Sequence, residues 1–563
     1  MTHRRHIARS TAFLATSVLV LSVGLPAYAM TSSDVQANSP QVAGAVGSDS
    51  TAVFPTNKQN EPTVAVNPLD ANMLLAGSND EQQQPACGPG TDRGADAPPS
   101  DCSFFPGVGT SGVYTSDDGG ATWTNRGLLD DQPGWKDSPF VSDGDPVIAF
   151  GPRPDASGRF SWANGVRAYY ASLASYKPGR SPFPPQMSPE YIAVSWSDDN
   201  GESWQGPSVA TTRDNPVDFN DKEWLAVDTA TKSPYFGRVY TSWTSFRQNT
   251  SEPVEVSYST DGGATFSAPK QVSPAANTVK KGRQGSQPVV GADGSVYVTF
   301  EQGSAHVVVI SRDGGVRWTR PRAVVTAVRD IADPIPGANF RTDSFASLAA
   351  DPADARRLVL AWSQNVPGKG GRIMVVRSAD RGLTWSAPVQ VSTSTEGYAF
   401  FQGLSVAPDG RVDLGYQALV TTDPSTFGTG NAWIDAYYAS SSNHGETFSE
   451  PVKISTRSSD PAVSAQNNLQ RQFWGDYSQM ASSAHKAWFI YTDSRNGSGC
   501  EAVDAYQHYL VDNGLVLRGD MADRIAARTG ATPAAEPGTK PAPPVDCPSQ
   551  FGNTDVFVSV VTP

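Results

Sequence analysis

The sequence predicts an all-β protein built from repeated four-stranded units, and three observations carry this prediction. A turn pattern built on Ser, Asp, Gly, Thr and Trp recurs six times along the chain. Seven short segments that read as the first strand of a unit recur between these turns. The intervening strands are short and rich in Val, Tyr and Thr, which favour β structure. Repeats of this kind let 563 residues close into one structure instead of several domains.

The recurring turn reads Ser-x-Asp-x-Gly-x-Thr-Trp, and some copies replace the Asp, the Thr or the Trp. The six copies begin at Ser116, Ser197, Ser259, Ser311, Ser378 and Ser441. The Asp and Ser side chains satisfy N–H groups of their own turn, while the Gly takes a conformation with positive φ. The aromatic residue then returns to the sheet as an apolar anchor. The pattern therefore predicts six tight hairpins at equivalent places in their units.

Each hairpin belongs to a unit of four strands, and the fourth unit shows the order most clearly. Its strands are expected at 287–291, 295–301 and 306–310, followed by the turn and a last strand at 320–325. The units open at 61–65, 145–149, 223–227, 287–290, 344–348, 402–406 and 476–480. Seven openings against six turns predict seven units. The last unit continues through 487–492 and 555–561 and lacks a fourth strand, which residues 51–54 are available to supply.

The six turns are Asp boxes, and the chain resembles the Asp-box (BNR-repeat) β-propellers of the sialidase superfamily over residues 53–561. The resemblance implies a radial arrangement, so we expect a seven-bladed β-propeller, with six blades, the number in sialidase catalytic domains, as the alternative. It also implies that the loops leading into the innermost strands converge on a central channel, on the face opposite the boxes. The implied activity is that of a glycoside hydrolase of the exo-α-sialidase type that acts on extracellular glycans. A non-catalytic scaffold that binds glycans or proteins is the alternative.

The N-terminus reads as an export signal. Residues 1–29 combine three Arg, an apolar run over 11–25 and small residues before the expected cleavage site. Residues 30–52 are expected to form a flexible leader, and 53–563 a single propeller domain with insertions at 81–111 and 496–553. No later stretch has the length and apolar character of a membrane helix. We therefore expect a secreted, extracellular monomer without a membrane anchor.

Each insertion contains one cysteine pair. In an exported protein we expect the disulfides Cys87–Cys102 and Cys500–Cys547, although four cysteines allow two other pairings. The formal charge of −13 argues against nucleic acid as a partner. The histidines lack metal-ligand spacing, so no cofactor or zinc site is expected, whereas calcium at 143–145 or 218–223 is left open.

Three arginines lie shortly before inner strands. Arg283, Arg341 and Arg471 would suit a substrate carboxylate, because a guanidinium binds a carboxylate through two parallel hydrogen bonds. The resemblance implies such a triad, which sialidases use for sialic acid. The first arginine of the family triad has no counterpart, since residues 60–62 read Asn-Glu-Pro. The alternative role of the arginines is ion pairing with Asp343, Asp476 or Asp493.

Hydrolysis of a glycoside needs an acid for the leaving oxygen and an attacking group on the other side of the sugar. Sialidases use a Tyr paired with a Glu, and the resemblance makes Tyr477 the candidate attacker and Glu223 its partner. Asp145 or Asp221 is the candidate acid, by position at the channel. If the sugar is neutral, the same acids supply two carboxylates instead. The substrate-binding candidates are Arg283, Arg341, Arg471, Trp474, Asp476 and Arg495. Four tryptophans either stack on sugars or pack between blades: Trp224, Trp243, Trp362 and Trp474.

Overall fold

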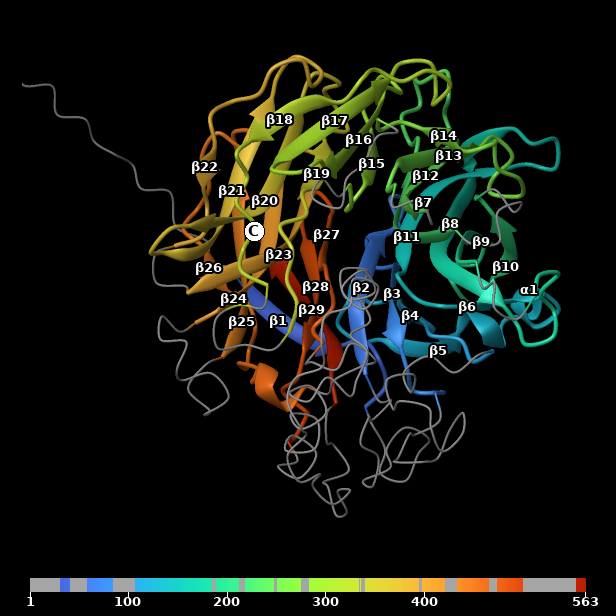
Figure 1. The fold of residues 1–563 in the computed structure, drawn as a ribbon, viewed down its shortest axis with the longest axis horizontal. Helices are drawn as coiled ribbons and strands as arrows, with labels where there is room; N and C mark the ends of the chain where they lie inside the picture. The colour runs from blue at the N-terminus through green and yellow to red at the C-terminus, as the bar shows by residue number, and fades with distance from the viewer. Residues whose placement is uncertain are drawn as a thin grey trace, which may run out of the picture.

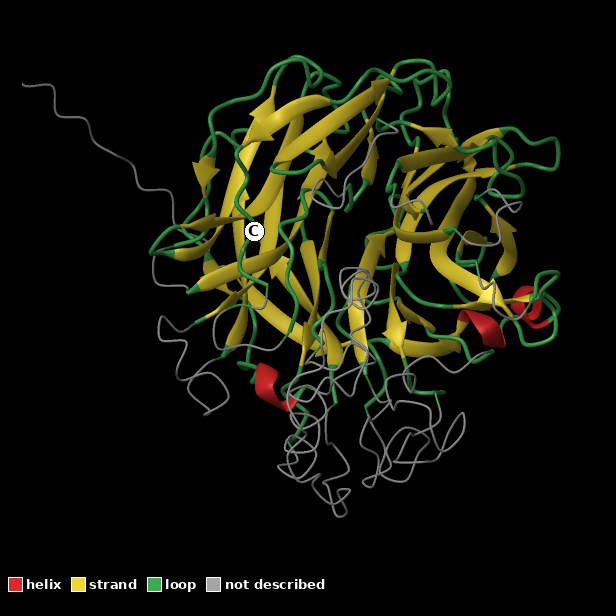
Figure 2. Ribbon diagram, viewed as in Figure 1, coloured by secondary structure: helices red, strands yellow, loops and turns green. Residues whose placement is uncertain are grey.

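The computed structural model describes residues 31–40, 58–84, 107–184, 189–211, 218–247, 251–274, 283–333, 335, 340–393, 397–420, 433–464, 473–499 and 553–563. Figure 1 shows their strands in seven sheets around a common centre, and the chain passes from sheet to sheet in order around the ring. Figure 2 shows how little helix accompanies the strands. The seven-bladed prediction is therefore confirmed, and the six-bladed alternative is wrong.

Five blades are simple four-stranded antiparallel sheets, which run from the inner strand outward in chain order. The first contains β2 (Gln59–Val66), β3 (Leu74–Asp80), β4 (Ser111–Ser116) and β5 (Thr124–Leu128). The third contains β11 (Phe219–Val227), β12 (Val239–Phe246), β13 (Val254–Ser259) and β14 (Lys270–Gln271). The fourth contains β15 (Gln287–Val290), β16 (Val296–Glu301), β17 (Ala305–Ser311) and β18 (Arg322–Thr326), which confirms its predicted strands to within two residues. The fifth contains β19 (Ser347–Ala350), β20 (Leu358–Val366), β21 (Gly370–Ser378) and β22 (Val389–Gln390), and the sixth β23 (Tyr398–Val406), β24 (Val412–Leu419), β25 (Ile434–Ser441) and β26 (Val452–Lys453).

The second blade departs from this plan. It contains β6 (Phe140–Ser142), β7 (Val147–Pro154), β8 (Phe160–Tyr176), β9 (Tyr191–Ser197) and β10 (Gln205–Val209). Both β6 and β7 pair with the long strand β8, at opposite ends of it. The short helical elements η2 (Leu129–Asp131) and α1 (Pro133–Lys136) precede this blade, and η4 (Pro461–Val463) follows the sixth.

The seventh blade closes the ring with a strand from the N-terminus. Its order is β27 (Gln479–Ser482), β28 (Ala487–Asp493), β29 (Asp555–Thr562) and β1 (Thr31–Gln36), which lies beside β29 in Figure 1. The prediction that 51–54 supply this strand is wrong, and so is the flexible-leader prediction for residues 31–36; residues 51–54 lie outside the described chain. The reason is chemical: the carboxylate of Asp34 pairs with Arg495 Nη1 at 2.7 Å and accepts a hydrogen bond from Thr456 N at 2.9 Å.

All six Asp boxes form the predicted turn. In the first copy Asp118 Oδ1 accepts from Thr122 N at 2.9 Å, and Ser116 Oγ accepts from Gly120 N, whose residue has a φ of 88°. The equivalent Ser–Gly bond measures between 2.8 and 3.0 Å in every copy. Trp204 of the second copy is the fully buried anchor of the six, whereas the aromatic anchors of the other five copies are half-buried.

The hydrophobic core is divided into clusters, several of which lie between neighbouring blades. The largest joins the first two blades through residues such as Leu75, Tyr170 and Trp204, and the rings of Tyr170 and Trp204 meet edge to face at 5.5 Å. Such packing fixes each blade against the next, so that the starts of the inner strands face one another across the centre.

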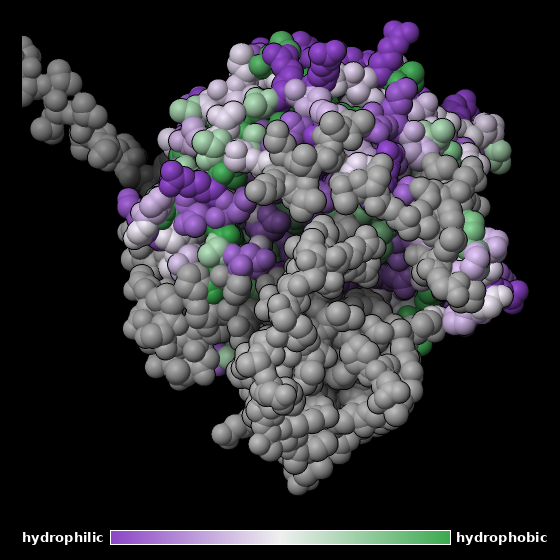
Figure 3. Space-filling view, viewed as in Figure 1, coloured by the Kyte–Doolittle hydropathy of each residue, from purple (hydrophilic) through white to green (hydrophobic). Residues whose placement is uncertain are grey.

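The two predicted insertions fall between β3 and β4 and between β28 and β29. Cys87, Cys102, Cys500 and Cys547 lie outside the described residues, as does the expected signal over 1–29, so the disulfides and secretion stay predictions. None of the helices in the described ranges has the length and apolar character needed to cross a bilayer. Hydrophilic side chains predominate over the described part of the face seen in Figure 3, with apolar residues scattered among them.

Candidate functional site

Near the start of six of the seven inner strands, one residue has a left-handed backbone conformation. Glu61, Asp145, Lys222 and Phe401 have φ of 52°, 51°, 56° and 49°, while the fourth and seventh blades use Gly285 and Gly475. In β2, β11 and β23 the strand ladder shifts register at this point. A non-glycine residue is strained in this region, by about 1–3 kcal/mol, so the surrounding structure has to impose it.

Three of these strained residues bring their charged side chains together. The ammonium of Lys222 lies 3.4 Å from Glu61 Oε1 and 3.4 Å from Asp145 Oδ2, and it also contacts Asp476 Oδ2. Asn79 holds this arrangement, because it donates to Glu61 Oε2 at 2.8 Å and accepts from the backbone N–H of Asp145 at 2.7 Å. Charges from the first, second, third and seventh blades therefore meet at the centre of the ring.

Arg341 adds the fifth blade to this group. Its Nε and Nη2 atoms donate to the two carboxylate oxygens of Asp476 at 2.7 and 2.6 Å, and Nη2 lies 3.7 Å from Glu61 Oε1. The guanidinium thus binds Asp476 in the bidentate geometry that arginine favours. We call Glu61, Asp145, Lys222, Arg341 and Asp476 the axial charge network.

Burial and mutual charge set the protonation states of this network. Burial alone would raise the pKa of Asp476, but Arg341 and Lys222 outweigh it and hold that pKa below its usual range. Burial, followed by the negative charge of Asp145, raises the pKa of Glu61 well above its usual range. For Lys222, burial opposes the ammonium, yet Asp145, Asp476 and Glu61 together raise its pKa. Lys222 and Asp476 are therefore a stable ion pair, and only 9% and 7% of their surfaces are exposed.

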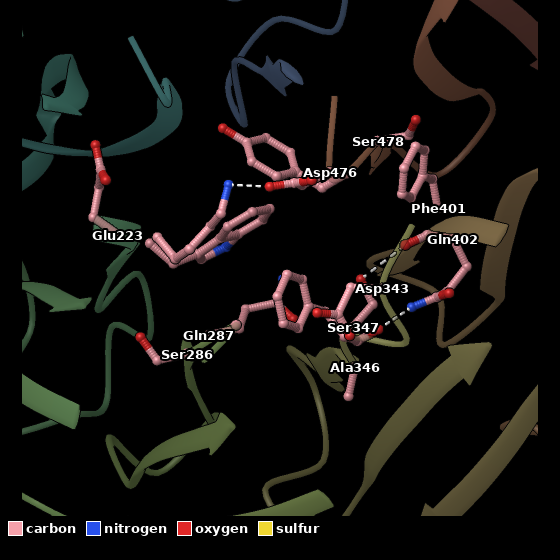
Figure 4. Close-up of a pocket in the computed structure, with 15 residues that line it drawn as sticks. Glu223, Ser286, Gln287, Asp343, Ala346, Ser347, Phe401, Gln402, Asp476 and Ser478 are labelled. Carbon is pink, nitrogen blue, oxygen red and sulfur yellow. Dashed lines mark hydrogen bonds and ion pairs between the residues drawn. The ribbon is translucent and has the colours of Figure 1, made fainter. Parts of the chain in front are cut away.

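A cavity of about 50 Å³ lies beside the network. Figure 4 shows its walls, which come from the third to the seventh blades. The lining residues are Lys222, Glu223, Trp224, Gly285, Ser286, Gln287, Asp343, Phe345, Ala346, Ser347, Phe401, Gln402, Asp476, Tyr477 and Ser478. We call this cavity the axial hollow. It combines charged groups, amides, hydroxyls and aromatic rings, as sugar-binding sites do.

Two carboxyl groups of the axial hollow have opposite pKa shifts. Burial, then the negative charge of Asp330, raises the pKa of Asp343 to about 7, and the charge of Asp476 adds to this effect. Asp476 itself stays ionised because of its two cationic partners. One acid that holds a proton near neutral pH and one that does not therefore line the same cavity.

Asp343 also belongs to a group of three acids. One carboxylate oxygen from each of Glu301, Asp330 and Asp343 lies within 4.8 Å of the others, and Asp330 is exposed. Among the described residues this is the group whose spacing could hold a metal ion. The segments 143–145 and 218–223, where calcium was left open from the sequence, form no such group in the described chain.

Tyr477 and Glu223 both line the hollow, as predicted, but they do not form the expected pair. The phenol oxygen of Tyr477 and both carboxylate oxygens of Glu223 are buried without a hydrogen-bond partner among the described residues. Figure 4 shows the Glu223 carboxylate pointing away from Asp476. Burial raises the pKa of Glu223 and that of Tyr477 well above their usual ranges. Trp224 meets the Tyr477 ring edge to face at 5.6 Å.

The two predicted acids lie close to the hollow without lining it. Asp145 belongs to the axial charge network, and burial raises its pKa although Lys222 opposes the shift. Asp221 accepts a hydrogen bond from the backbone N–H of Lys222 at 2.8 Å, which is a turn-stabilising contact. Asp343, which was not a candidate acid, lines the cavity together with Glu223 and Asp476.

The predicted convergence of arginines is not found among the described residues. Arg341 reaches the centre, but Arg283 donates to Gln302 at 3.3 Å and lies near the charge of Glu252, outside the axial charge network. Arg495 pairs with Asp493 and Asp34 in the seventh blade, with its guanidinium 4.0 Å from the ring of Phe557. Arg471 lies outside the described chain. For Arg341 and Arg495 the alternative role, ion pairing with neighbouring aspartates, is the one observed.

Of the candidate tryptophans, only Trp224 lines the hollow. Trp474 is fully buried, packs against Phe340 and donates to Gln417 at 3.2 Å, so it is a core residue. Trp243 and Trp362 are also buried.

The sequence interpretation missed Lys222 and did not select Asp343 as an acid. In the structure Lys222 occupies the same place in its unit as Glu61 and Asp145, whereas the openings read from the sequence put Glu223 there. Asp343 carries no local signal, because its pKa depends on Asp330 and on burial in the assembled ring.

The chain was compared with known protein families, curated sequences and solved structures. Residues 189–394 match the family model of the BNR repeat-like domain. Among solved structures, a Hadza microbial sialidase is 16% identical, with 68% of this chain and 70% of that chain covered and a TM-score of 0.37. The leech intramolecular trans-sialidase is 15% identical over 68% and 67% of the chains, with a TM-score of 0.40. An α-L-arabinofuranosidase of Fusarium graminearum is 14% identical over 69% and 96%, with a TM-score of 0.39. No curated protein sequence matches the chain. With seven blades and six Asp boxes in its described residues, the chain is an Asp-box β-propeller that contains a BNR repeat-like domain.

Proposed function

We propose that this protein is a secreted glycoside hydrolase that acts on extracellular glycans at the axial hollow. The observation that carries the proposal is the pair Asp343 and Asp476. Burial and the charge of Asp330 raise the pKa of Asp343 to about 7, while the pKa of Asp476, against the effect of burial, is held low by Arg341 and Lys222. Two carboxyl groups with pKa values moved in opposite directions are what general acid catalysis of glycoside cleavage requires.

In this proposal Asp343 donates its proton to the leaving glycosidic oxygen as the bond from that oxygen to the anomeric carbon breaks. Asp476 remains ionised and stabilises the positive charge that develops on the sugar ring in the transition state. A water molecule then forms the new bond to the anomeric carbon and gives a proton to the Asp343 carboxylate, which restores the acid. We assign this second role to Asp476 instead of the predicted Tyr477–Glu223 pair. Among the described residues, no hydrogen bond joins the Tyr477 phenol to the Glu223 carboxyl group, so Glu223 is not placed to take the phenol proton in the resting site.

The sequence resemblance predicts an exo-α-sialidase, and release of sialic acid is therefore the first reaction to measure. The assay follows fluorescence from 4-methylumbelliferyl glycosides, first the sialic acid conjugate and then a panel of other sugars. Release from at least one conjugate, lost in Asp343→Asn and largely kept in Tyr477→Phe, is the expected result. If activity is lost in Tyr477→Phe and kept in Asp343→Asn, the assignment of roles is wrong.

The second candidate function is a non-catalytic scaffold. It is favoured by one observation: the charges of the axial network are paired with one another, as in a purely structural core. No release from any conjugate, with a folded protein, would support the scaffold and contradict the hydrolase.

A further inference from the structure

We infer that the axial hollow accepts an uncharged sugar and excludes sugars that carry a carboxylate. This inference names the substrate class of the same cavity and rests on the proposed function. It reverses the expectation of a sialic acid substrate that the family resemblance gives.

The first argument is the balance of charge at the walls. Among the lining residues described, Asp476 is the acid whose pKa is held low, and Lys222 is the one basic residue. The ammonium of Lys222 already contacts carboxylates of Glu61, Asp145 and Asp476. A substrate carboxylate would therefore enter next to an ionised aspartate without a cation to receive it. Like charges placed together in this way cost several kcal/mol, because the site is shielded from water.

The second argument is that Asp476 already occupies the place of a bound carboxylate. The guanidinium of Arg341 faces its two oxygens at 2.7 and 2.6 Å, which is the contact that a sialic acid carboxylate would need. To bind there, a substrate would have to displace Asp476 and leave it buried without a partner. Removing a partner from a buried charge pair is strongly unfavourable.

The third argument concerns the groups that remain available. Tyr477 Oη and Ser478 Oγ are buried without a hydrogen-bond partner in the described chain, and both residues line the hollow. Both groups are hydroxyls, which can donate and accept hydrogen bonds. Buried polar groups are costly when they are left unpaired, so these groups favour a ligand that supplies neutral hydroxyls.

The test uses matched conjugates that differ in one charged group. Rates of 4-methylumbelliferyl β-D-glucoside and β-D-galactoside are compared with those of the β-D-glucuronide and the α-sialoside, and α-L-arabinofuranoside widens the neutral set. We expect kcat/KM to be at least about 100-fold higher for one neutral conjugate than for either acidic one. Equal or faster cleavage of an acidic conjugate would overturn the inference while the hydrolase proposal stands. If no conjugate is cleaved, the hydrolase proposal is wrong. A binding measurement then decides whether the hollow excludes sugars that carry a carboxylate.

Calorimetry with N-acetylneuraminic acid supplies that binding measurement. The wild-type protein should show no heat of binding at a ligand concentration of about 1 mM. This concentration is near the upper end of typical enzyme KM values. Asp476→Asn removes the carboxylate that is bound to the Arg341 guanidinium, so this variant should gain binding of N-acetylneuraminic acid. Tight binding by the wild type, or no gain in a variant whose circular dichroism spectrum is native, would overturn the inference.

Discussion

The two ends of the blades use the same kinds of residue to opposite effect. At the box end, Asp118 lies near a glycine of positive φ, and its carboxylate oxygens accept hydrogen bonds from its own turn. Burial would raise the pKa of Asp118, but the hydrogen bonds from Thr122 and Ser116 lower it. At the axial end, acids also lie at or near left-handed residues, but burial raises the pKa of Glu61 and Asp145. The box carboxylates are hydrogen-bonded within their own turns, so the same sequence pattern can recur in every blade. The axial carboxylates are paired with residues of other blades, so the surroundings of each one differ.

The largest contrast is expected in activity. Asp343 and Asp380 belong to the same blade, one at the hollow and the other in the box. Asp343→Asn should lower kcat/KM by about 10²–10⁴-fold, the usual contribution of a general acid, whereas Asp380→Asn should leave it unchanged. Rates are measured with the best conjugate of the panel. Equal effects of the two variants would remove the functional difference between the two ends.

Buried and exposed ion pairs should differ in stability. Lys222→Met leaves the axial carboxylates without their ammonium and should lower the free energy of unfolding by about 3–5 kcal/mol at pH 8. The exposed pair of Arg381 with Asp293, 3.2 Å apart, is the control, and Arg381→Met should cost less than about 1 kcal/mol.

The loss in Lys222→Met should shrink toward pH 5. Without the ammonium, the pKa of the axial carboxyl groups rises in the folded state, so these groups bind protons more readily there than in the unfolded chain as the pH falls. Urea unfolding at both pH values measures the effect. A loss that is constant with pH would mean that Lys222 acts through packing alone.

The aromatic anchors of the boxes should not be equivalent. Trp204 is fully buried against Tyr170, so Trp204→Ala should cost about 3–5 kcal/mol. Trp385 is half-buried, and Trp385→Ala should cost about half as much or less. The comparison is made by chemical denaturation. A larger loss for Trp385 would show that the boxes anchor their blades equally, whatever their burial.

The smallest effect on stability is expected for the exchange of a box Asp for Asn, because the sixth box already has Asn at this position. Asn443 makes the same turn as the box aspartates, and its Oδ1 accepts from Thr447 N at 3.0 Å. Asp118→Asn should therefore cost less than about 1 kcal/mol. A loss of several kcal/mol in thermal or urea unfolding would show that the negative charge, and not the turn geometry, holds the box.

The sequence was a good guide to whatever is local and repeated. Six boxes, seven openings and the strands of the fourth unit follow from turn chemistry and alternation, and they lie where expected. The closing strand was misplaced because its fit depends on Asp34 meeting Arg495, residues 461 positions apart along the chain by their numbers. Four of the predicted residues, namely Tyr477, Glu223, Asp476 and Arg341, lie near the centre of the ring, and their roles on a substrate stay predictions. The pairing of Arg341 with Asp476 and the pKa of Asp343 could not be predicted, because they exist only once the blades are assembled.

The pH dependence of kcat/KM tests the central claim most directly. The account requires Asp343 to be protonated and Asp476 ionised. The pKa of Asp343, raised to about 7 chiefly by burial, places the loss of its proton there, so kcat/KM should be constant from pH 5 to about 6.5 and fall tenfold per pH unit above about 7. Asp476 keeps its charge throughout this range, so no second limb should appear above pH 5. A rate that rises through pH 7, or that does not change between pH 6 and 9, would contradict the account.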